Sequence, residues 1–106
     1  MSEKLISSVG VIVLSSDTVI NIGSSYRSDI FYQFHNSIPE NLGVLYRKEG
    51  AVGPELIYSE KGKEPITLLY GEELTIAGLW LMFLGNYLLV CAREGDLRVA
   101  VRERRA

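Results

Sequence analysis

The sequence predicts an all-β fold: a two-sheet antiparallel sandwich, or a jelly-roll-like barrel, of about 8–9 strands in one domain over residues 1–106. Two observations support this prediction. Short runs rich in β-branched and aromatic residues recur about every 8–12 residues between turn signals, and few stretches repeat apolar residues at a helical period. With 47% hydrophobic and 23% charged residues, the chain has the composition of an ordinary globular domain.

The N-terminal part supplies the first predicted strands. Residues 5–14 contain the run from Val9 to Leu14, which is apolar on both faces and is typical of a central buried strand. After a turn at residues 15–17, residues 18–22 form a second strand. Residues 26–35 alternate with the period of two that a half-buried strand requires. One face of this strand is expected to carry Tyr26, Ser28, Ile30, Tyr32 and Phe34, and the other Arg27, Asp29, Phe31, Gln33 and His35.

The C-terminal part continues the pattern. Further short strands are predicted at residues 42–47, 55–59, 66–70 and 97–102. Residues 74–84 and 87–92 read as two longer strands joined at Gly85 and Asn86, a two-residue hairpin signal with glycine suited to the first position of a type II′ turn. The alternative is one helix over residues 72–93, because the run lacks charge and has Glu at its start and Arg at its end, as the helix dipole favours.

The charge-free run also bears on membranes and compartment. Residues 74–92, 19 in all, pass the length test for a membrane span, but the Gly85-Asn86 pair in the middle and the lack of aromatic belts at both ends argue against one. The N-terminus does not read as a secretory signal. Cys91 is the only cysteine, so no intramolecular disulfide forms. We therefore expect a cytoplasmic or virion location, with Cys91 as a buried, inert thiol.

The sequence offers no catalytic or metal centre. His35 is the only histidine, so one chain cannot build a two-histidine metal or copper site. Nothing in the sequence brings His35 next to Cys91 as a nucleophile pair. Glu72 and Glu73 are adjacent and would point to opposite faces of a strand. With no glycine-rich phosphate-binding motif either, we expect no enzyme activity, cofactor or metal.

The charge distribution argues against nucleic acid as a partner. The formal net charge is -2, which gives no field to attract a phosphate backbone. The arginines concentrate in the tail from Arg93 to Arg105, which contains no aromatic residue on which a base could stack. Arginines on an edge strand have a structural explanation, because they discourage the strand from pairing with the edge of another sheet.

The predicted hairpin is the most informative segment, because it is apolar on both faces. A strand at residues 79–84 puts Leu79, Leu81 and Phe83 on one face and Trp80, Met82 and Leu84 on the other, and only one face can line the core. Something else must then cover the second face: another subunit, another protein, an apolar ligand or lipid. A central hairpin covered by loops of the same chain would also explain it. The candidate interface residues are Leu79, Trp80, Leu81, Met82, Phe83 and Tyr87.

We therefore expect a non-enzymatic structural or assembly subunit that self-associates through the apolar hairpin. Coat and appendage subunits of virions use such sandwiches, an analogy that rests on architecture alone. Two alternatives stay open. A carbohydrate- or peptide-binding β-sandwich module would carry tyrosines beside polar side chains at one end of the sandwich, and a small enzyme could build its site between subunits.

Overall fold

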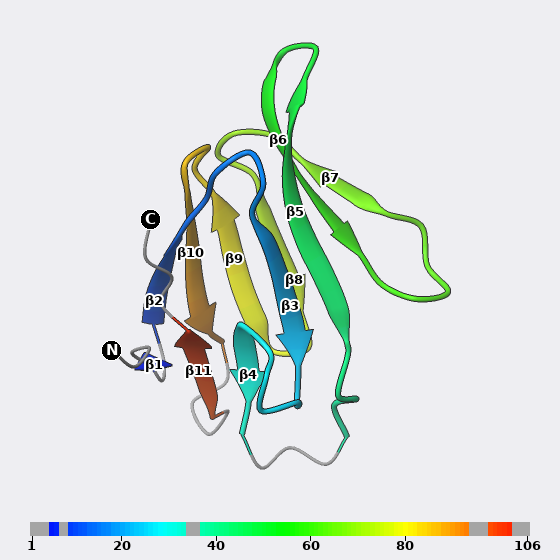
Figure 1. The fold of residues 1–106 in the computed structure, drawn as a ribbon, viewed down its shortest axis with the longest axis vertical. Helices are drawn as coiled ribbons and strands as arrows, with labels where there is room; N and C mark the ends of the chain where they lie inside the picture. Colours follow the sequence, from blue (N-terminus) through cyan, green and yellow to red (C-terminus); the bar gives the residue numbers. More distant parts are fainter. Residues whose placement is uncertain (1–4, 7–8, 34–36, 94–97, 103–106) are drawn as a thin grey trace.

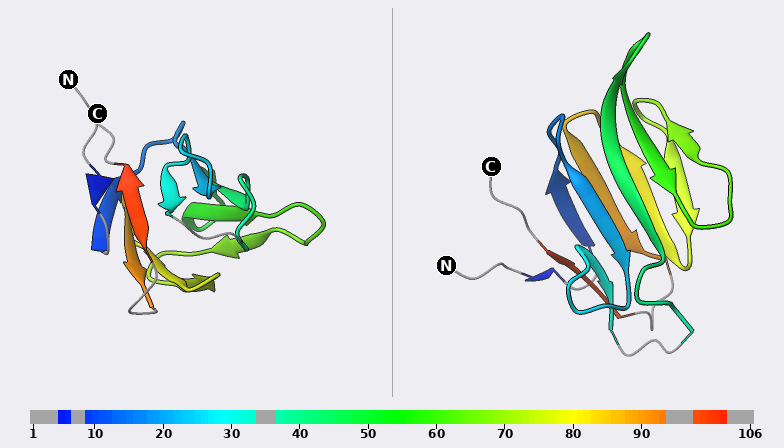
Figure 2. Two further views of the ribbon diagram at one scale, coloured as in Figure 1. Left: turned by 90° about the horizontal axis from the view of Figure 1, so that it is seen from below. Right: turned by 45° about the vertical axis from the view of Figure 1, so that its right-hand side comes forward.

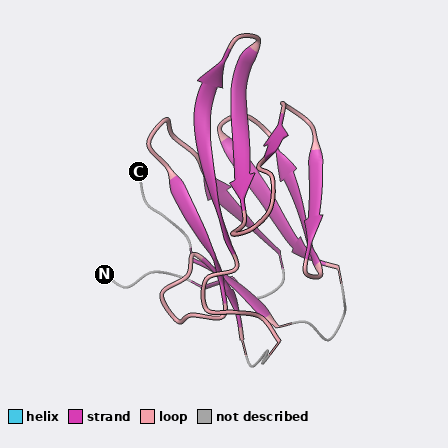
Figure 3. Ribbon diagram, turned by 90° about the vertical axis from the view of Figure 1, so that its right-hand side faces the viewer, coloured by secondary structure: helices cyan, strands magenta, loops and turns pink. Residues whose placement is uncertain are grey.

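The computed structural model describes residues 5–6, 9–33, 37–93 and 98–102. Within these residues it contains strands, turns and loops but no helix (Figure 3). The predicted two-sheet, all-β architecture is therefore confirmed, and the alternative of a helix over residues 72–93 is wrong. No helix in the described part of the chain is long and apolar enough to cross a membrane.

The larger sheet has seven strands in the order β1-β11-β4-β3-β5-β6-β7 (Figure 1). Its strands are β1 (Leu5–Ile6), β3 (Val19–Gly23), β4 (Ile30–Tyr32), β5 (Gly43–Gly50), β6 (Gly53–Ser59), β7 (Ile66–Leu68) and β11 (Val99–Arg102). Neighbouring strands pair antiparallel except β3 and β4, which run parallel. The β5–β6 hairpin extends past the other strands at one end of the molecule (Figure 1).

The smaller sheet has four strands in the order β2-β10-β9-β8, all antiparallel. Its strands are β2 (Val9–Val13), β8 (Glu73–Ile76), β9 (Leu79–Phe83) and β10 (Tyr87–Ala92). The two sheets lie over one another as two layers (Figure 2). Because each strand gives alternate side chains to the layer between the sheets, the core draws on both sheets.

Aliphatic side chains, one phenylalanine and two tyrosines fill the space between the sheets. The core cluster comprises Ile12, Leu14, Ile20, Ile22, Ile30, Tyr32, Leu45, Leu56, Tyr58, Leu68, Leu79, Leu81, Phe83, Leu88, Val90, Val99 and Val101. Many of these are β-branched, as suits strands that must pack on a pleated surface. The hydroxyl groups of the two tyrosines are satisfied, because Tyr32 donates to the Ile76 carbonyl at 3.3 Å and Tyr58 to a Glu60 carboxylate oxygen at 2.7 Å.

The prediction of one central strand over residues 5–14 is wrong. The described residues of this segment form β1 in the larger sheet and β2 in the smaller. Among the described residues, strand β2 pairs with β10 alone and is thus an edge strand. Val11 and Val13 point away from the core and are 42% and 45% exposed. An all-apolar run here reflects an outer sheet face that is itself apolar, rather than burial on both sides by the same chain.

The strand predicted over residues 26–35 is shortened to β4, Ile30–Tyr32. Ser28, Ile30 and Tyr32 are buried together as the alternation indicates, but Tyr26 lies in a turn with 74% of its surface exposed. The turn closes because the Ser28 amide donates to the Ser25 carbonyl at 2.9 Å, which takes the chain out of the extended conformation. Phe34 and His35 lie outside the described residues.

The hairpin at Gly85 and Asn86 is confirmed, since β9 and β10 pair across it and Gly85 has a φ of 75°. The single strand predicted over residues 74–84 is wrong. Ala77 and Gly78, with φ of 44° and 82°, make a two-residue turn between β8 and β9, and Ile76 pairs with Leu79. Positive φ at both turn residues is the requirement of a type I′ turn. Alanine gives no sequence signal for it, so the break was not predicted.

The Ala77 conformation leads to a stability prediction. A left-handed conformation costs a residue with a Cβ roughly 1–2 kcal/mol, and asparagine tolerates it better than alanine. Ala77→Asn is therefore expected to raise the free energy of unfolding by roughly 0.5–1 kcal/mol, measured by urea denaturation. Gly78→Ala, which adds a Cβ at positive φ, is the opposite control and is expected to lower it. A loss of stability in Ala77→Asn would contradict the assigned turn.

The two core tyrosines lead to a prediction about alkaline pH. Burial raises the pKa of both Tyr32 and Tyr58 above the ordinary value of 10.0, and the hydrogen bond to Glu60 raises that of Tyr58 further. Both side chains lose their protons at lower pH in the unfolded chain than in the fold. Their contribution to stability is therefore present below about pH 10 and is lost as the pH rises above it. Urea midpoints are expected to fall over this range.

Variants separate this effect from general alkaline denaturation. Tyr32→Phe and Tyr58→Phe remove the group that titrates, so the urea midpoint of each variant is expected to fall less steeply above about pH 10 than that of the native chain. Tyr70→Phe, at an exposed position, is the matched control and should follow the native chain. Equal slopes in all four proteins would contradict the prediction.

Candidate functional site

The outward side of the four-stranded sheet carries a continuous apolar layer, here called the apolar face. Its side chains come from three adjacent strands and point away from the core: Val11, Val13, Trp80, Met82, Tyr87, Leu89 and Cys91. The most exposed members are Val11, Val13 and Tyr87, and half of the surface of Tyr87 (50%) is exposed. The other members are half-buried against one another. None of these side chains is charged.

The strand register makes this layer contiguous. Leu89 on β10 is paired with Val11 on one side and with Met82 on the other, so these three form a row across three strands. On either side of this row, Cys91 is paired with Trp80 and Tyr87 is paired with Val13. Directly paired side chains on one face of an antiparallel sheet have Cβ atoms about 4.5–5.5 Å apart. The rows therefore leave no polar gap between them.

The structure divides the predicted interface residues between two places. Leu79, Leu81 and Phe83 are fully buried in the core between the sheets, with 0% of their surface exposed. Trp80, Met82 and Tyr87 lie on the apolar face. The alternating burial of β9 thus answers the question that the sequence left open: the side of the strand that holds Trp80 and Met82 points outward.

Cys91 differs from its prediction as a buried thiol. It is half-buried on the apolar face, and its sulfur lies 3.5 Å from the Ala92 carbonyl oxygen, to which the thiol donates. The neighbouring Trp80 donates its indole N–H to a Glu73 carboxylate oxygen at 2.6 Å. Glu73 stands on the edge strand β8, so a charged group borders the apolar face at that side. The bond satisfies the indole nitrogen and leaves the ring as apolar surface.

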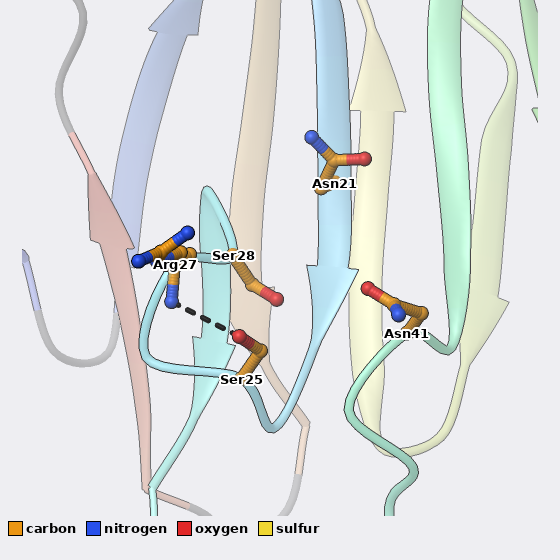
Figure 4. A pocket seen from close by; sticks show the side chains of 5 residues that line it. All are labelled: Asn21, Ser25, Arg27, Ser28 and Asn41. Atoms are coloured by element: carbon orange, nitrogen blue, oxygen red, sulfur yellow. Dashed lines mark hydrogen bonds between the residues drawn. The ribbon is translucent and has the colours of Figure 1, made fainter.

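A second feature lies on the outward side of the larger sheet: a polar pocket of about 190 Å³ lined by Asn21, Ser25, Arg27, Ser28 and Asn41 (Figure 4). Asn21 comes from β3, where it alternates with the buried Ile20 and Ile22. Ser25, Arg27 and Ser28 come from the loop between β3 and β4. This pocket has no direct signal in the amino-acid sequence, because its members belong to three separate segments.

The β3–β4 loop is held to the sheet through Asp29. The Asn21 amide donates to Asp29 Oδ2 at 2.8 Å, and the Asp29 amide donates to the Asn21 carbonyl at 2.8 Å. Asp29 is buried at 6% exposure, so its carboxylate takes the place of a backbone acceptor at the start of β4. On its other side the Asp29 carbonyl accepts the Arg102 amide at 2.8 Å. These bonds explain how a six-residue connection, 24–29, joins two parallel strands.

The remaining side of the pocket depends on Gly23. A Cβ at this position would lie 2.0 Å from the Glu40 carbonyl oxygen, so only glycine permits the segment at residues 37–42 to approach. The Ser24 amide donates to the Pro39 carbonyl at 3.0 Å, and the Leu42 amide donates to the Ile22 carbonyl at 2.8 Å. This approach brings Asn41 to the pocket.

Groups considered for catalysis have structural partners. Glu72 accepts a hydrogen bond from the Leu69 amide at 2.7 Å, while Glu73 accepts one from Trp80. The two adjacent carboxylates are thus engaged separately. In the part of the chain that the structure describes, no group of three or more His, Cys, Asp and Glu side chains is placed to hold a metal ion. His35, the only histidine, lies outside that part.

Among the arginines of the C-terminal tail, Arg93 and Arg98 are exposed, whereas Arg102 donates from Nη2 to the Tyr26 carbonyl at 2.7 Å. The Arg102 guanidinium also lies over the Tyr26 ring, 5.4 Å from its centre. Arg104 and Arg105 fall outside the described residues. Arg102 therefore anchors the β3–β4 loop.

Comparison of the chain with protein-family models, with curated proteins and with solved structures finds no match. The candidate sites therefore rest on the geometry of the apolar face and of the polar pocket.

Proposed function

We propose that the chain is a non-enzymatic structural or assembly subunit that self-associates, and that the apolar face of one copy packs against the apolar face of a second copy. The observation that carries the proposal is the unbroken row Val11–Leu89–Met82 on the outward side of the smaller sheet. The largest contiguous apolar patch on a folded protein, typically a few hundred Å², is often an interaction site.

The chemistry of the face favours a second copy as the occupant. A two-fold contact places the same patch on both partners, so the patch must complement itself. An uncharged aliphatic and aromatic layer satisfies this condition, because no like charges meet in its centre. Glu73 lies at the β8 edge and would remain at the rim, where a charged group keeps its contact with water. Two sheet faces stack at about 10 Å with interdigitated side chains.

The size of the apolar face determines how strongly two copies are expected to associate. The three strands of the face lie about 4.8 Å apart and contribute about five residues each at about 3.3 Å per residue, which gives a footprint of roughly 14 by 17 Å, or about 240 Å². Stable complexes bury about 800 Å² of accessible surface on each partner. Protruding side chains add accessible surface to the footprint, but the contact stays below that size. We therefore propose reversible association that depends on protein concentration, as in subunits that assemble only when many copies are gathered.

Small β-sandwiches serve as coat and appendage subunits of virions, and the proposal includes this class by analogy of architecture. A cytoplasmic or virion location belongs to the same proposal. The fold alone does not distinguish these subunits from other assembly proteins.

The first test introduces a charge on the apolar face. Met82→Glu places a carboxylate at the β9 end of the row Val11–Leu89–Met82, within the proposed contact, where its desolvation opposes association. We expect the native chain to increase in mean mass with concentration in sedimentation velocity, and the variant to stay monomeric with an unchanged β-type circular dichroism spectrum. Thr67→Glu, at an exposed strand position of the larger sheet, is the matched control and should associate like the native chain.

Leu81→Glu gives the contrasting result on the same strand. Leu81 is fully buried in the core, and an unpaired buried charge costs several kcal/mol. This variant is expected to unfold rather than dissociate. A native chain that stays monomeric across the accessible concentration range would contradict the proposal, and so would a Met82→Glu variant that associates normally.

The second test uses Cys91 as a reporter. Its thiol lies on the apolar face, paired with Trp80, and would be covered in the assembled state. We expect the rate of labelling by a maleimide in excess to fall as the protein concentration rises. In Met82→Glu the rate is expected to be independent of concentration. A labelling rate for the native chain that does not change with concentration would place Cys91 outside the contact.

A further inference from the structure

The polar pocket on the larger sheet brings together hydrogen-bonding groups that the fold does not use. Within the described residues, no hydrogen bond or ion pair engages the side-chain amides of Asn21 and Asn41 or the Arg27 guanidinium. These side chains come from β3, from the β3–β4 loop and from the segment before β5, and all border one concave space (Figure 4). Convergence of such groups is characteristic of a ligand site.

The two serine hydroxyls complete the lining. Ser25 Oγ accepts the Arg27 amide at 3.2 Å, which leaves its own proton to be donated. Ser28 Oγ is directed toward the Glu40 carbonyl at a long 3.5 Å, and only 2% of this residue is exposed. In Figure 4 the Ser28 hydroxyl and the Asn41 amide point toward one another across the pocket. The lining therefore presents both donors and acceptors.

The loop that carries these groups is rigidly placed. Asp29 ties it to β3, Arg102 ties it to β11, and Gly23 allows the neighbouring segment to bond to it. The Ser25 amide also donates to the Glu40 carbonyl at 3.3 Å. A site whose groups are already held in position loses little conformational entropy on binding.

The chemistry of the lining selects a class of ligand. Two carboxamides and two hydroxyls match a molecule whose own groups both donate and accept, which is the property of vicinal sugar hydroxyls. An anion fits less well, because the Asp29 carboxylate, which accepts the Asn21 backbone amide at 2.8 Å, places a negative charge close to the lining. Arg27 contributes further donors at the rim.

We propose that the pocket binds one neutral sugar unit, such as the terminal residue of a glycan. Its volume of about 190 Å³ lies below the roughly 300–1,000 Å³ of pockets for larger ligands, which limits the ligand to a single ring. Tyr26 is not part of the lining, since its ring packs edge-on against Phe31 and beneath Arg102. Without an aromatic platform for the sugar ring, we expect weak binding.

The pocket lies on the opposite sheet from the apolar face, so this inference does not depend on self-association. The experiment uses the ¹⁵N-labelled full chain, titrated in turn with the methyl glycosides of glucose, galactose, mannose and N-acetylglucosamine. We expect at least one glycoside to shift the side-chain amide signals of Asn21 and Asn41 with saturation. Asn41→Ala is expected to raise the apparent Kd about 3- to 10-fold through the lost hydrogen bonds.

Asn86→Ala, at an exposed turn of the smaller sheet, is the matched control and should bind like the native chain. Titrations with inorganic phosphate and with acetate test the anion alternative. Saturable shifts at the pocket with these ions but not with the glycosides would overturn the proposal in favour of an anion site. An absence of saturable shifts with every glycoside would overturn it as well, and so would glycoside shifts that Asn41→Ala leaves unchanged.

Discussion

The packing of the two sheets on one shared core determines what the rest of the molecule can present. Each strand has two sides, and the core takes only one of them. On β9 it takes Leu79, Leu81 and Phe83, which are completely buried. Trp80 and Met82 must then point outward, because side chains alternate along a strand. The apolar face thus follows from the hydrophobic effect acting on one side of a strand that is apolar on both.

The outward sides of the two sheets differ in chemistry. The smaller sheet presents aliphatic and aromatic side chains in register across three strands, whereas the larger presents Asn21 beside a polar loop. The difference arises from local sequence. Asp29 substitutes for a backbone partner and lets the chain return parallel to β3 within a few residues, and Gly23 admits the segment that carries Asn41. Two residues outside the hydrophobic core cluster, Asp29 and Gly23, therefore shape the pocket.

The sequence was sufficient for the fold class and the Gly85-Asn86 hairpin, because strand periodicity and turn chemistry are local properties. It was insufficient where a local pattern has two physical causes. An apolar edge strand such as β2 reads like a central strand, and Ala77 adopts a left-handed conformation that its side chain does not favour. The pocket escaped sequence reasoning because Asn21, the β3–β4 loop and Asn41 meet only in the folded sheet, through the Asp29 hydrogen bonds and the close approach at Gly23. The adjacent Gly23-Ser-Ser25 cluster was the available signal, and it reads as an ordinary turn.

Arg47 has a consequence for how the molecule unfolds. It projects from the long β5–β6 hairpin of the larger sheet, and its Nε donates at 2.8 Å to the carbonyl of Gly85, in the turn of the smaller sheet. Only 10% of its side chain is exposed, whereas Glu49, its ionic partner, is 65% exposed. Separating the sheets would break the Gly85 contact and open the core beneath it at once. The hydrogen bond between Arg47 and Gly85 and the core below it therefore couple the two layers, so that neither sheet persists as an independent folding unit.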